Sequence, residues 1–526
     1  MRSIDYFDRG HDRDPNRTCI VDTETGESWT FAEVKAETER VAAAMQKAGF
    51  KSQDHVGLYG PNGGMLLIVL LAIWRVNGKW IPVNTRNAMD ANVGYIDYVR
   101  CQWMFYHSSL ADGVTELRSR CDTLDTFICI DKPCSTSADG DDPSLEQFTG
   151  GVSAADFAEP EIDAFGNLED IVLIAPTGGT TGPSKGANVT NLGWGTMIET
   201  ASDAMGGRTD NPVALVSAPI THAAGPIALA TLCLGATQVI LPGFDAERVL
   251  RTIEEYKVSH MYLPPTAMYQ LLASPEIDSH DYSSLRIFIL VGSPCSPEKL
   301  RNAVDTFGPC MCQSYGQVEC PMIIAWLPPE DVAKFAKEAP EKLASCGKVS
   351  RSIKVALLDD DGKQVPLGEA GEICARGALV THSYFEMPEA TAEARQFGWH
   401  HTGDVGKFDE EGYLYIVDRK KDMIVSGGFN VFTAEVEAAI TELEAVREAV
   451  VFGIPHEKWG EQVHATVVAD GITQEEIIAH AKARLGGVKA PKTVEFVDSI
   501  PRTAAGKMDK KVLRRKYWGD SDRLVN

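Results

Sequence analysis

Short apolar runs of strand length alternate with helix-like segments along most of this chain, and that alternation constrains its fold more than any other feature. Residues 55–59 (HVGLY) and 80–83 (WIPV) suit buried strands, and the apolar run 65–74 between them suits a buried helix. A further helix is predicted from Thr30, where Glu33 completes a capping box. The strand and helix order recurs at 213–216, 225–234 and 238–241. Because such segments pack as layers around a mostly parallel sheet, an α/β fold is expected.

The pattern changes twice in the last third of the chain. From about residue 346, short alternating segments with Asp-Gly turns, such as 355–362, predict a small β-rich subdomain. The charged stretch 418–422 (DRKKD) has little to bury and lies between two apolar segments, which favours an interdomain hinge. The sequence therefore predicts a large N-terminal domain, 1–420, of layered α/β subdomains plus the β-rich one. A mobile α+β C-terminal domain, 421–526, is expected to follow it.

Composition narrows the class of ligand and the location. A formal net charge of −24 argues against nucleic acid as a partner, because such binding neutralises phosphates with clustered Lys and Arg. The twelve cysteines show no paired metal spacing, so zinc is not expected. The N-terminus lacks an apolar signal core, and the run 65–74 is too short to span a bilayer. A cytoplasmic protein with reduced thiols and no transmembrane segment is predicted.

Two polar segments leave simple alternatives open. Residues 135–142 read as a polar surface loop. A basic cluster near the C-terminus either attracts a phosphorylated ligand or forms a solvated helix face, and the second is the more common origin of such clusters. Its members are Lys510, Lys511, Arg514, Arg515 and Lys516.

A loop rich in glycine and threonine follows the strand-like run 171–174. Residues 177–186 (TGGTTGPSKG) hold four glycines, three threonines and one lysine. Glycines let backbone N–H groups approach an anion, hydroxyls add donors, and a lysine adds a mobile charge, so the loop suits a polyphosphate. It is not a Walker A loop, because Gly186 and not Ser or Thr follows Lys185. An ordinary surface loop is the alternative.

Four later segments of the chain are also rich in polar, charged and glycine residues. They are 313–319 (QSYGQVE), 398–404 (GWHHTGD), 418–435 (beginning DRKKD) and 501–507 (PRTAAGK). Together the five motifs resemble, in order and spacing, the adenylate-forming superfamily. That superfamily contains acyl-CoA synthetases, aryl-CoA ligases, luciferases and peptide-synthetase adenylation domains. The resemblance covers nearly the whole chain and is strongest to the acid-CoA ligases.

The resemblance implies a two-step reaction that uses ATP, Mg²⁺ and coenzyme A. A carboxylate first attacks the α-phosphate of ATP, giving an acyl-AMP and pyrophosphate, and the acyl group then passes to the thiol of CoA. Because the first step brings two anions together, the site must neutralise charge and align the reactants.

The resemblance also implies roles for individual residues. The β- and γ-phosphates would be held by Thr177, Gly178, Gly179, Thr180, Thr181, Gly182 and Lys185. Glu319 would bind Mg²⁺, and Tyr315 with Gly316 would pack against adenine. Asp404 and Arg419 would hold the ribose, and Lys507 would bridge the carboxylate and the α-phosphate. Taken singly, Glu319 is typical of a surface glutamate, Tyr315 of a core tyrosine and Asp404 of a turn residue. Arg419 and Lys507 are, by the same measure, typical of solvated cations.

In this superfamily the small domain swings between two poses, and the hinge residue matches Lys421. After the swing, Lys507 would leave the site, and the loop at Gly427 and Gly428 would form part of a pantetheine tunnel. One departure from the family pattern is Val318, where a threonine hydroxyl usually contacts the α-phosphate. The loss of that donor would cost on the order of 1 kcal/mol.

The acid-binding residues implied by the resemblance are His222, Gly292 and Ser293. His222 equally suits a hydrogen-bonded core histidine, and the small residues equally suit tight packing. Amino-acid adenylating domains carry an aspartate in the region 217–226, and none occurs here, so an acid without an α-amino group is favoured. A medium-chain, aryl or alicyclic acid is the expected substrate.

Three functions remain open from the sequence. Only nineteen residues follow Lys507, so no carrier domain is expected there and free CoA is the simpler acceptor. The alternatives are a stand-alone adenylating enzyme that loads a carrier protein, and a catalytically silent nucleotide-binding regulator. The oligomeric state is also open, and a homodimer is one of the states considered.

Overall fold

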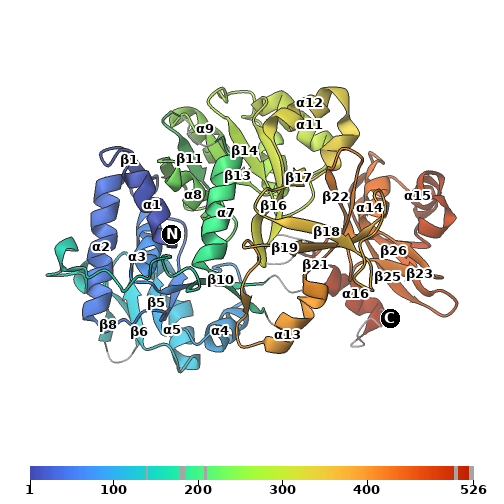
Figure 1. Cartoon of the computed structure of the whole chain (residues 1–526). Coiled ribbons are helices and arrows are strands. Elements are labelled where there is room, and N and C mark those ends of the chain that lie inside the picture. The colour runs from blue at the N-terminus through green and yellow to red at the C-terminus, as the bar shows by residue number, and fades with distance from the viewer. Residues whose placement is uncertain (138–139, 178–183, 207–209, 503–507, 520–526) are drawn as a thin grey trace. The chain divides into compact units, whose positions relative to one another are not determined.

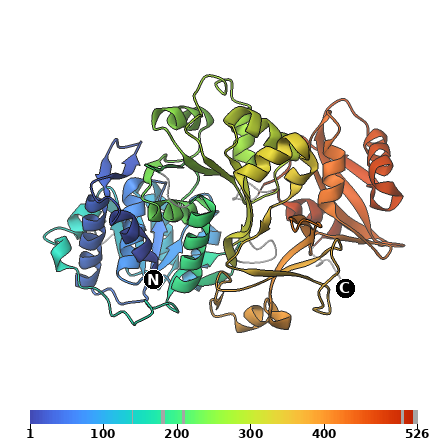
Figure 2. The ribbon, with the colours of Figure 1, turned by 45° about the horizontal axis from the view of Figure 1, so that its top comes forward.

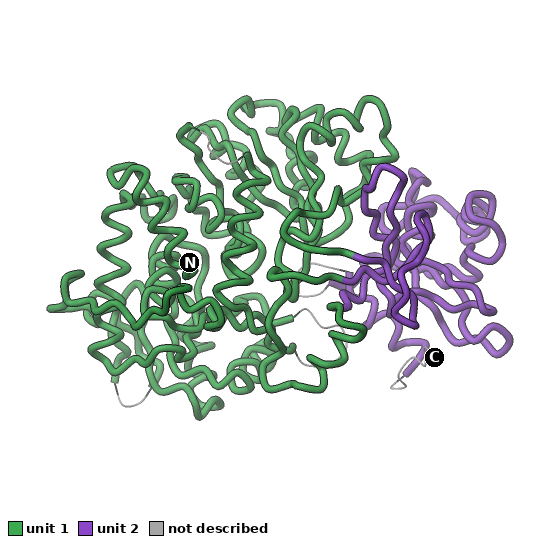
Figure 3. The backbone as a smooth tube through the Cα atoms, in the orientation of Figure 1, with its two compact units in different colours: residues 1–355, 375–400 green, residues 356–374, 401–526 purple. Residues whose placement is uncertain are grey.

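The computed structural model describes residues 1–137, 140–177, 184–206, 210–502 and 508–519. The chain divides into two compact units, shown in green and purple in Figure 3. Unit 1 contains residues 1–355 and 375–400, and unit 2 contains 356–374 and 401–526. Residue 420 lies inside unit 2, and the predicted division into 1–420 and 421–526 stays a prediction.

Unit 1 is built on two sheets (Figures 1 and 2). The seven-stranded sheet has, in spatial order, β20 (Ser383–Tyr384), β10 (Gly186–Thr190), β9 (Ile171–Pro176), β4 (Lys79–Pro82), β3 (His55–Tyr59), β5 (Trp103–Tyr106) and β6 (Thr126–Cys129). The nine-stranded sheet has β17 (Lys348–Val349), β16 (Cys320–Leu327), β15 (Met311–Gln317), β14 (Ile287–Leu290), β13 (His260–Leu263), β11 (Val213–Val216), β12 (Thr237–Ile240), β1 (Thr18–Asp22) and β2 (Ser28–Thr30). Strands β9, β4, β3, β5 and β6 of the first sheet run parallel, and so do β15, β14, β13, β11, β12 and β1 of the second, as the predicted α/β fold requires.

Unit 1 has many helices, and several of them connect parallel strands, because a parallel pair needs a crossover. The helices are α1 (Ser3–His11), α2 (Phe31–Lys47), α3 (Gly64–Arg75), α4 (Met89–Tyr98), α5 (Ala111–Arg120), α6 (Leu145–Phe148), α7 (Asn191–Ala204), α8 (Ala224–Cys233), α9 (Ala246–Glu255), α10 (Pro265–Leu272), α11 (Pro297–Phe307), α12 (Pro329–Glu338) and α13 (Pro388–Glu393). The predicted capping box is present at the start of α2, where Thr30 and Glu33 bond reciprocally.

A layer of helices lies between the two sheets. Helix α3 contacts β3 and β4 of one sheet and β1 of the other, and α7 contacts β9, β10 and β16. All residues of α3 from Leu66 to Arg75 are buried, as the apolar run 65–74 predicts. Within the described residues, no helix has both the length and the apolar character needed to cross a membrane.

The polar stretch 135–142 differs from the surface loop expected of it. Strands β7 (Cys134–Ser137) and β8 (Gly140–Asp142) pair as a short antiparallel ribbon. The Asp142 carboxylate is buried, and it accepts hydrogen bonds from Tyr106 Oη at 2.8 Å and Arg118 Nη2 at 2.6 Å. The ribbon is therefore fastened to the seven-stranded sheet by a polar group that the sequence pattern assigns to solvent.

Unit 2 holds most of a four-stranded sheet and all of a five-stranded one. The first runs β18 (Lys354–Leu358), β19 (Gly371–Arg376), β21 (His400–Phe408) and β22 (Leu414–Arg419). The second runs β24 (Phe429–Val431), β23 (Ile424–Ser426), β26 (Gly460–Ala469) and β25 (Val446–His456), with β27 (Thr493–Phe496) beside β26. Its helices are α14 (Thr433–Thr441), α15 (Gln474–Lys489) and α16 (Lys510–Trp518). The predicted β-rich and α+β segments are both present.

The twelve cysteines are free thiols. Eleven of them are buried and Cys134 is half-buried. Burial raises the pKa of most of the buried thiols, for example to about 12 for Cys295 and Cys310. They behave as small core residues and not as exposed nucleophiles.

Candidate active site

The base of the glycine- and threonine-rich loop is closed by backbone pairing. The loop joins β9 to β10, which pair antiparallel. The Thr177 N–H donates to the Lys185 carbonyl at 2.9 Å, and the Lys185 N–H donates to Thr177 Oγ1 at 3.2 Å. Thr177 is therefore buried at the end of β9 and fixes the point from which Lys185 extends. The other predicted phosphate ligands, Gly178, Gly179, Thr180, Thr181 and Gly182, lie outside the described residues.

Tyr384 joins the predicted phosphate lysine to the predicted metal ligand. Strand β20 pairs with β10, with Tyr384 opposite Ala187. The Lys185 ammonium lies 4.8 Å from the centre of the Tyr384 ring, a cation–π contact, and Tyr384 Oη donates to Glu319 Oε1 at 2.9 Å. Burial, reinforced by the Glu319 charge, raises the pKa of Tyr384, so its hydroxyl stays a donor at neutral pH. Sequence reasoning missed Tyr384.

The motif 313–319 covers the carboxyl end of strand β15 in the nine-stranded sheet and the turn that follows it. Tyr315 is buried in β15, and a Cβ on Gly316 would come within 2.6 Å of the Met322 backbone, so only glycine fits there. Glu319 lies in the turn between β15 and β16, and its carbonyl accepts the Thr381 N–H at 2.8 Å. This hydrogen bond places Glu319 beside the segment that carries Tyr384.

We expect Tyr384→Phe to weaken binding of Mg²⁺·ATP by about tenfold, because a hydrogen bond to a charged group contributes roughly 1.5 kcal/mol or more. The ring that faces Lys185 is retained, so the loss isolates the hydroxyl. Calorimetric titration of Mg²⁺·ATP measures the effect. Tyr98→Phe is the matched control, since its hydroxyl donates to the nearby Phe385 carbonyl and makes no bond to Glu319. Equal losses in both variants would contradict the role given to Tyr384.

The predicted acid-binding residues follow parallel strands of the nine-stranded sheet. His222 is exposed in the turn between β11 and α8, where its Nε2 lies 3.3 Å from Asn84 Nδ2. Gly292, with φ +101°, and Ser293 are exposed after β14. Because β11, β14 and β15 run parallel, these residues and Glu319 leave the same edge of the sheet. That edge is where ligands bind in open α/β sheets.

The two predicted ribose ligands face each other across a strand pair in unit 2. Asp404 in β21 is paired in register with Arg419 in β22. Arg419 Nε lies 3.4 Å from Asp404 Oδ1, and the Asp404 side chain is about nine-tenths buried while that of Arg419 is nearly half exposed. Because its side chain is nearly half exposed, Arg419 can contact a ligand at the edge of the sheet while it stays paired with Asp404.

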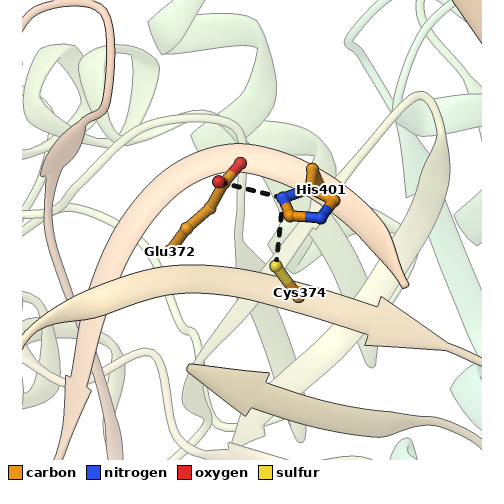
Figure 4. A group of neighbouring side chains, drawn as sticks. All are labelled: Glu372, Cys374 and His401. Carbon is orange, nitrogen blue, oxygen red and sulfur yellow. Dashed lines mark hydrogen bonds and ion pairs between the residues drawn. The ribbon is translucent and has the colours of Figure 1, made fainter. Parts of the chain in front are cut away.

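A buried carboxylate holds the turn that precedes Asp404. Glu372 Oε1 accepts the Gly403 N–H at 3.1 Å, and Oε2 receives His401 Nδ1 and Lys420 Nζ, both at 3.0 Å (Figure 4 shows His401 with Glu372 and Cys374). Thr402 Oγ1 accepts the Asp404 N–H at 3.1 Å. The Glu372 carboxylate is thus bonded on both oxygens and orients residues 401–404. The sequence does not predict this role for Glu372, because a single glutamate in an apolar strand matches no recognisable motif.

Glu372, Cys374 and His401 also bring three metal-ligand types within 4.8 Å of one another. Two observations do not suit a metal ion there. The Lys420 ammonium already neutralises Glu372, and burial raises the pKa of Cys374 to about 12, so the group is a thiol. The donor set fits a charge network better than a metal centre.

Glu372→Gln is expected to lower the unfolding free energy by about 1–3 kcal/mol at neutral pH, because it removes the charge that Lys420 and His401 meet. Burial raises the pKa of Glu372, but those hydrogen bonds outweigh it and hold the pKa below its ordinary value of 4.5. The stabilisation is therefore present above that value and is lost as pH falls through the folded pKa. Thermal unfolding near pH 7 and near pH 4 measures it, with the exposed Glu369→Gln as control. A difference that does not shrink at low pH would contradict this account.

The predicted hinge and tunnel residues lie on loops of unit 2. Burial, aided by the Arg419 charge, lowers the pKa of Lys421. Gly427 and Gly428 have φ of +58° and +82° and form the two-residue turn between β23 and β24, a geometry that disfavours other residues. Lys507 lies outside the described residues.

The C-terminal basic cluster is partly paired within unit 2. Lys510 Nζ lies 2.8 Å from Glu437 Oε1, Arg514 Nη1 lies 2.9 Å from Asp422 Oδ1, and Lys516 pairs with Glu495. These pairs attach α16 to helix α14, to the loop before β23 and to strand β27. Lys511 and Arg515 remain exposed on the helix.

Comparison with known proteins gives concordant matches. The sequence model of the family described as AMP-binding enzyme matches residues 7–385, and that of the AMP-binding enzyme C-terminal domain matches 435–507. The chain is 40% identical over 370 residues to the medium/long-chain-fatty-acid–CoA ligase FadD8 of Mycobacterium tuberculosis, spanning 68% of this chain and just 63% of that protein. It is 35% identical over 505 residues to the feruloyl-CoA synthase of an Amycolatopsis species, 94% of each. ATP-bound MatB from Rhodopseudomonas palustris superimposes with a TM-score of 0.86 at 28% identity, over 98% of this chain and 99% of that one.

Proposed function

Because this chain belongs to the AMP-binding enzyme family, we propose that it is an ATP-dependent carboxylic acid–CoA ligase. It forms an acyl-AMP with release of pyrophosphate and then transfers the acyl group to CoA, giving acyl-CoA and AMP. The observation that carries the proposal is the connected set Lys185, Tyr384 and Glu319, at the edge of the sheet where a ligand is expected. A cation and a carboxylate held by one tyrosine suit a polyphosphate with its metal ion.

In this proposal the phosphates and the metal ion are bound in unit 1. Thr177 with the loop 178–182 and Lys185 hold the β- and γ-phosphates. Glu319 supplies one oxygen to Mg²⁺, which prefers one or two carboxylates together with phosphate oxygens. Tyr315 and Gly316 form the face that receives adenine. The hydrogen bond from Tyr384 leaves the second Glu319 oxygen for the metal.

The other roles are assigned to the later motifs. Asp404 accepts hydrogen bonds from the ribose hydroxyls with Arg419 beside it, and Lys507 bridges the carboxylate and the α-phosphate. The segment 421–526 turns about Lys421 between the two half-reactions. The loop at Gly427 and Gly428 then contributes to the pantetheine path.

The acid is proposed to be a medium-chain, aryl or alicyclic carboxylic acid bound near His222, Gly292 and Ser293. The two curated relatives named above act on acids of different classes, so similarity alone does not choose among them. A cytoplasmic location is part of the proposal and is supported by twelve free thiols. A homodimer stays a prediction.

Two other functions differ in their expected behaviour. A stand-alone adenylating enzyme would release pyrophosphate without turnover by CoA and would load a carrier protein. A silent nucleotide binder, suggested by Val318 in place of threonine, would release none. The retention of Lys185, Glu319, Asp404 and Lys507 favours an active enzyme.

The test is pyrophosphate release from Mg²⁺·ATP across fatty, aryl and alicyclic acids, each with and without CoA, with the thioester identified by mass. CoA-dependent turnover with one acid class supports the ligase. A single burst without CoA and no turnover with it would favour the carrier-loading enzyme. No release with any acid would favour the silent binder.

A further inference from the structure

Helix α16 fixes the end of the chain segment that contains Lys507. Arg502 and Met508, which stand on either side of this segment, form an antiparallel bridge. The Asp509 N–H donates to the Pro501 carbonyl at 2.8 Å, and the Asp509 carboxylate caps α16 by accepting two N–H groups of its first turn at 3.1 and 3.3 Å. The position of α16 therefore determines where the segment with Lys507 starts and ends.

Two cations one turn apart on α16 attach the helix to the rest of unit 2. Lys510 Nζ donates to Thr433 Oγ1 at 2.8 Å and lies 2.8 Å from Glu437 Oε1, and both partners are on α14. Arg514 Nη1 lies 2.9 Å from Asp422 Oδ1. The four charged side chains are between 16% and 23% exposed. Ion pairs shielded from water in this way hold a geometry better than exposed pairs, and breaking one leaves a charge without its partner.

The Lys510 contacts continue to Asp418 at the end of β22. Asp418 Oδ1 accepts the Thr433 hydroxyl at 3.0 Å, and Oδ2 accepts the Thr433 N–H. Burial raises the pKa values of Asp418 and Glu437, and the Lys510 charge opposes the shift of both. Lys510 is thus the cation shared by two largely buried carboxylates. Because Asp418 directly precedes Arg419, these contacts reach from α16 to the strand that carries a predicted ribose ligand.

The second attachment lies beside the predicted hinge. Asp422 directly follows Lys421 in the chain. Burial acts to raise the pKa of Asp422, but the charges of Lys510 and Arg514 outweigh it and hold the pKa below its ordinary value of 3.8. Both cations of α16 therefore stabilise this one carboxylate, and they fix the helix to the residue that follows the hinge.

We propose that Lys510 and Arg514 are positioning residues for the adenylation step, because they hold α16, and through it the segment with Lys507, in place for attack on the α-phosphate. The inference rests on the proposed ligase function and adds two residues that act through Lys507. Neither residue takes part in making or breaking a bond, so their loss should lower the rate of acyl-AMP formation more than the affinity for ATP.

The first test is Lys510→Met, which keeps a long unbranched side chain and removes its charge. We expect acyl-AMP formation to slow by on the order of tenfold to a hundredfold, because a misplacement of about 1 Å can cost about a hundredfold. The KM for ATP and the conversion of preformed acyl-AMP to thioester should stay near wild type, and Lys510→Arg should recover most of the rate. The matched control is Lys511→Met, at an exposed position of the same helix, which should equal wild type. Rapid-quench kinetics measure both half-reactions.

A second test asks whether Lys510 acts through Lys507. In the Lys507→Ala background, adding Lys510→Met should slow acyl-AMP formation by less than about twofold, because a positioning residue has no effect once the residue it positions is gone. A substitution that merely destabilised unit 2 would slow both backgrounds alike. Arg514→Met should behave in the same way, so the test does not depend on one variant. Thermal unfolding confirms that each variant is folded.

Three results would overturn the inference and leave the ligase function intact. They are wild-type rates in folded Lys510→Met and Arg514→Met, an equal loss of both half-reactions, and an undiminished further loss in the Lys507→Ala background. If wild type forms no acyl-AMP with any acid, the ligase proposal fails instead. The inference survives that failure only if Lys510→Met and Arg514→Met speed hydrogen exchange of the amides of residues 509–512 and Lys511→Met does not.

Discussion

Replacing Lys507 with alanine should slow acyl-adenylate formation by on the order of 10²- to 10³-fold, while CoA-dependent conversion of preformed acyl-AMP stays close to the wild-type rate. The first half-reaction joins two anions, so a cation that bridges them stabilises the transition state, and loss of one such group typically has an effect of this size. In the second half-reaction AMP leaves with the electron pair of the broken acyl–oxygen bond on its phosphate, but in the proposed swing Lys507 has already left the site, so this step does not depend on it. Rapid-quench measurement of acyl-AMP, and of thioester from added acyl-AMP, separates the steps.

The matched control for that variant is Lys511→Ala. Lys511 is exposed on α16, a few residues beyond Lys507 in the same basic stretch, so it tests whether any lost cation there has the same effect. We expect both half-reactions of Lys511→Ala to match wild type. If a folded Lys507→Ala protein loses both half-reactions equally, the division of labour proposed for this lysine is wrong.

Glu319→Gln should reduce acyl-adenylate formation by on the order of a hundredfold and raise the Mg²⁺ concentration needed for half-maximal rate. The amide keeps the shape of the side chain and can still accept the Tyr384 hydroxyl, but it offers the metal a neutral oxygen. Because the metal ion neutralises the phosphates during attack, weaker metal binding lowers the rate as well as the affinity. Initial rates across a Mg²⁺ series at fixed ATP measure both effects.

Glu389→Gln controls for the loss of one negative charge near this site, because Glu389 is exposed on α13 in the segment after Tyr384. Its Mg²⁺ dependence should equal that of wild type. An unchanged Mg²⁺ requirement in Glu319→Gln would remove Glu319 from the metal site and leave it as a partner of Tyr384 alone.

Features set by local sequence were predictable. The strand at 55–59, the buried helix at 65–74 and the cap at Thr30 follow from periodicity and capping chemistry that act within a few residues, and the structure confirms them. The ribbon at 134–142 was not predictable, because the burial of Asp142 depends on partners contributed by β5 and α5. Polar composition alone assigns such a segment to solvent.

The same distinction holds for the candidate site. Lys185 and Glu319 stand in recognisable motifs, but the hydroxyl and ring that join them belong to Tyr384, which reaches them through the pairing of β20 with β10. Glu372 likewise acts through tertiary hydrogen bonds to 401–404 and Lys420. Residues that position others carry no chemistry of their own at a characteristic spacing, so a motif search does not find them.

The burial of the cysteines has a practical consequence for assays of this protein. Eleven of the twelve thiols are buried, and burial raises the pKa of most of them, to about 12 for Cys295 and Cys310, so a chromogenic disulfide reagent should react slowly with the native protein. The thiol of added CoA is then the main species that such a reagent reports. Disappearance of that signal follows thioester synthesis directly, and a sudden excess of titratable thiols would report unfolding in the same cuvette.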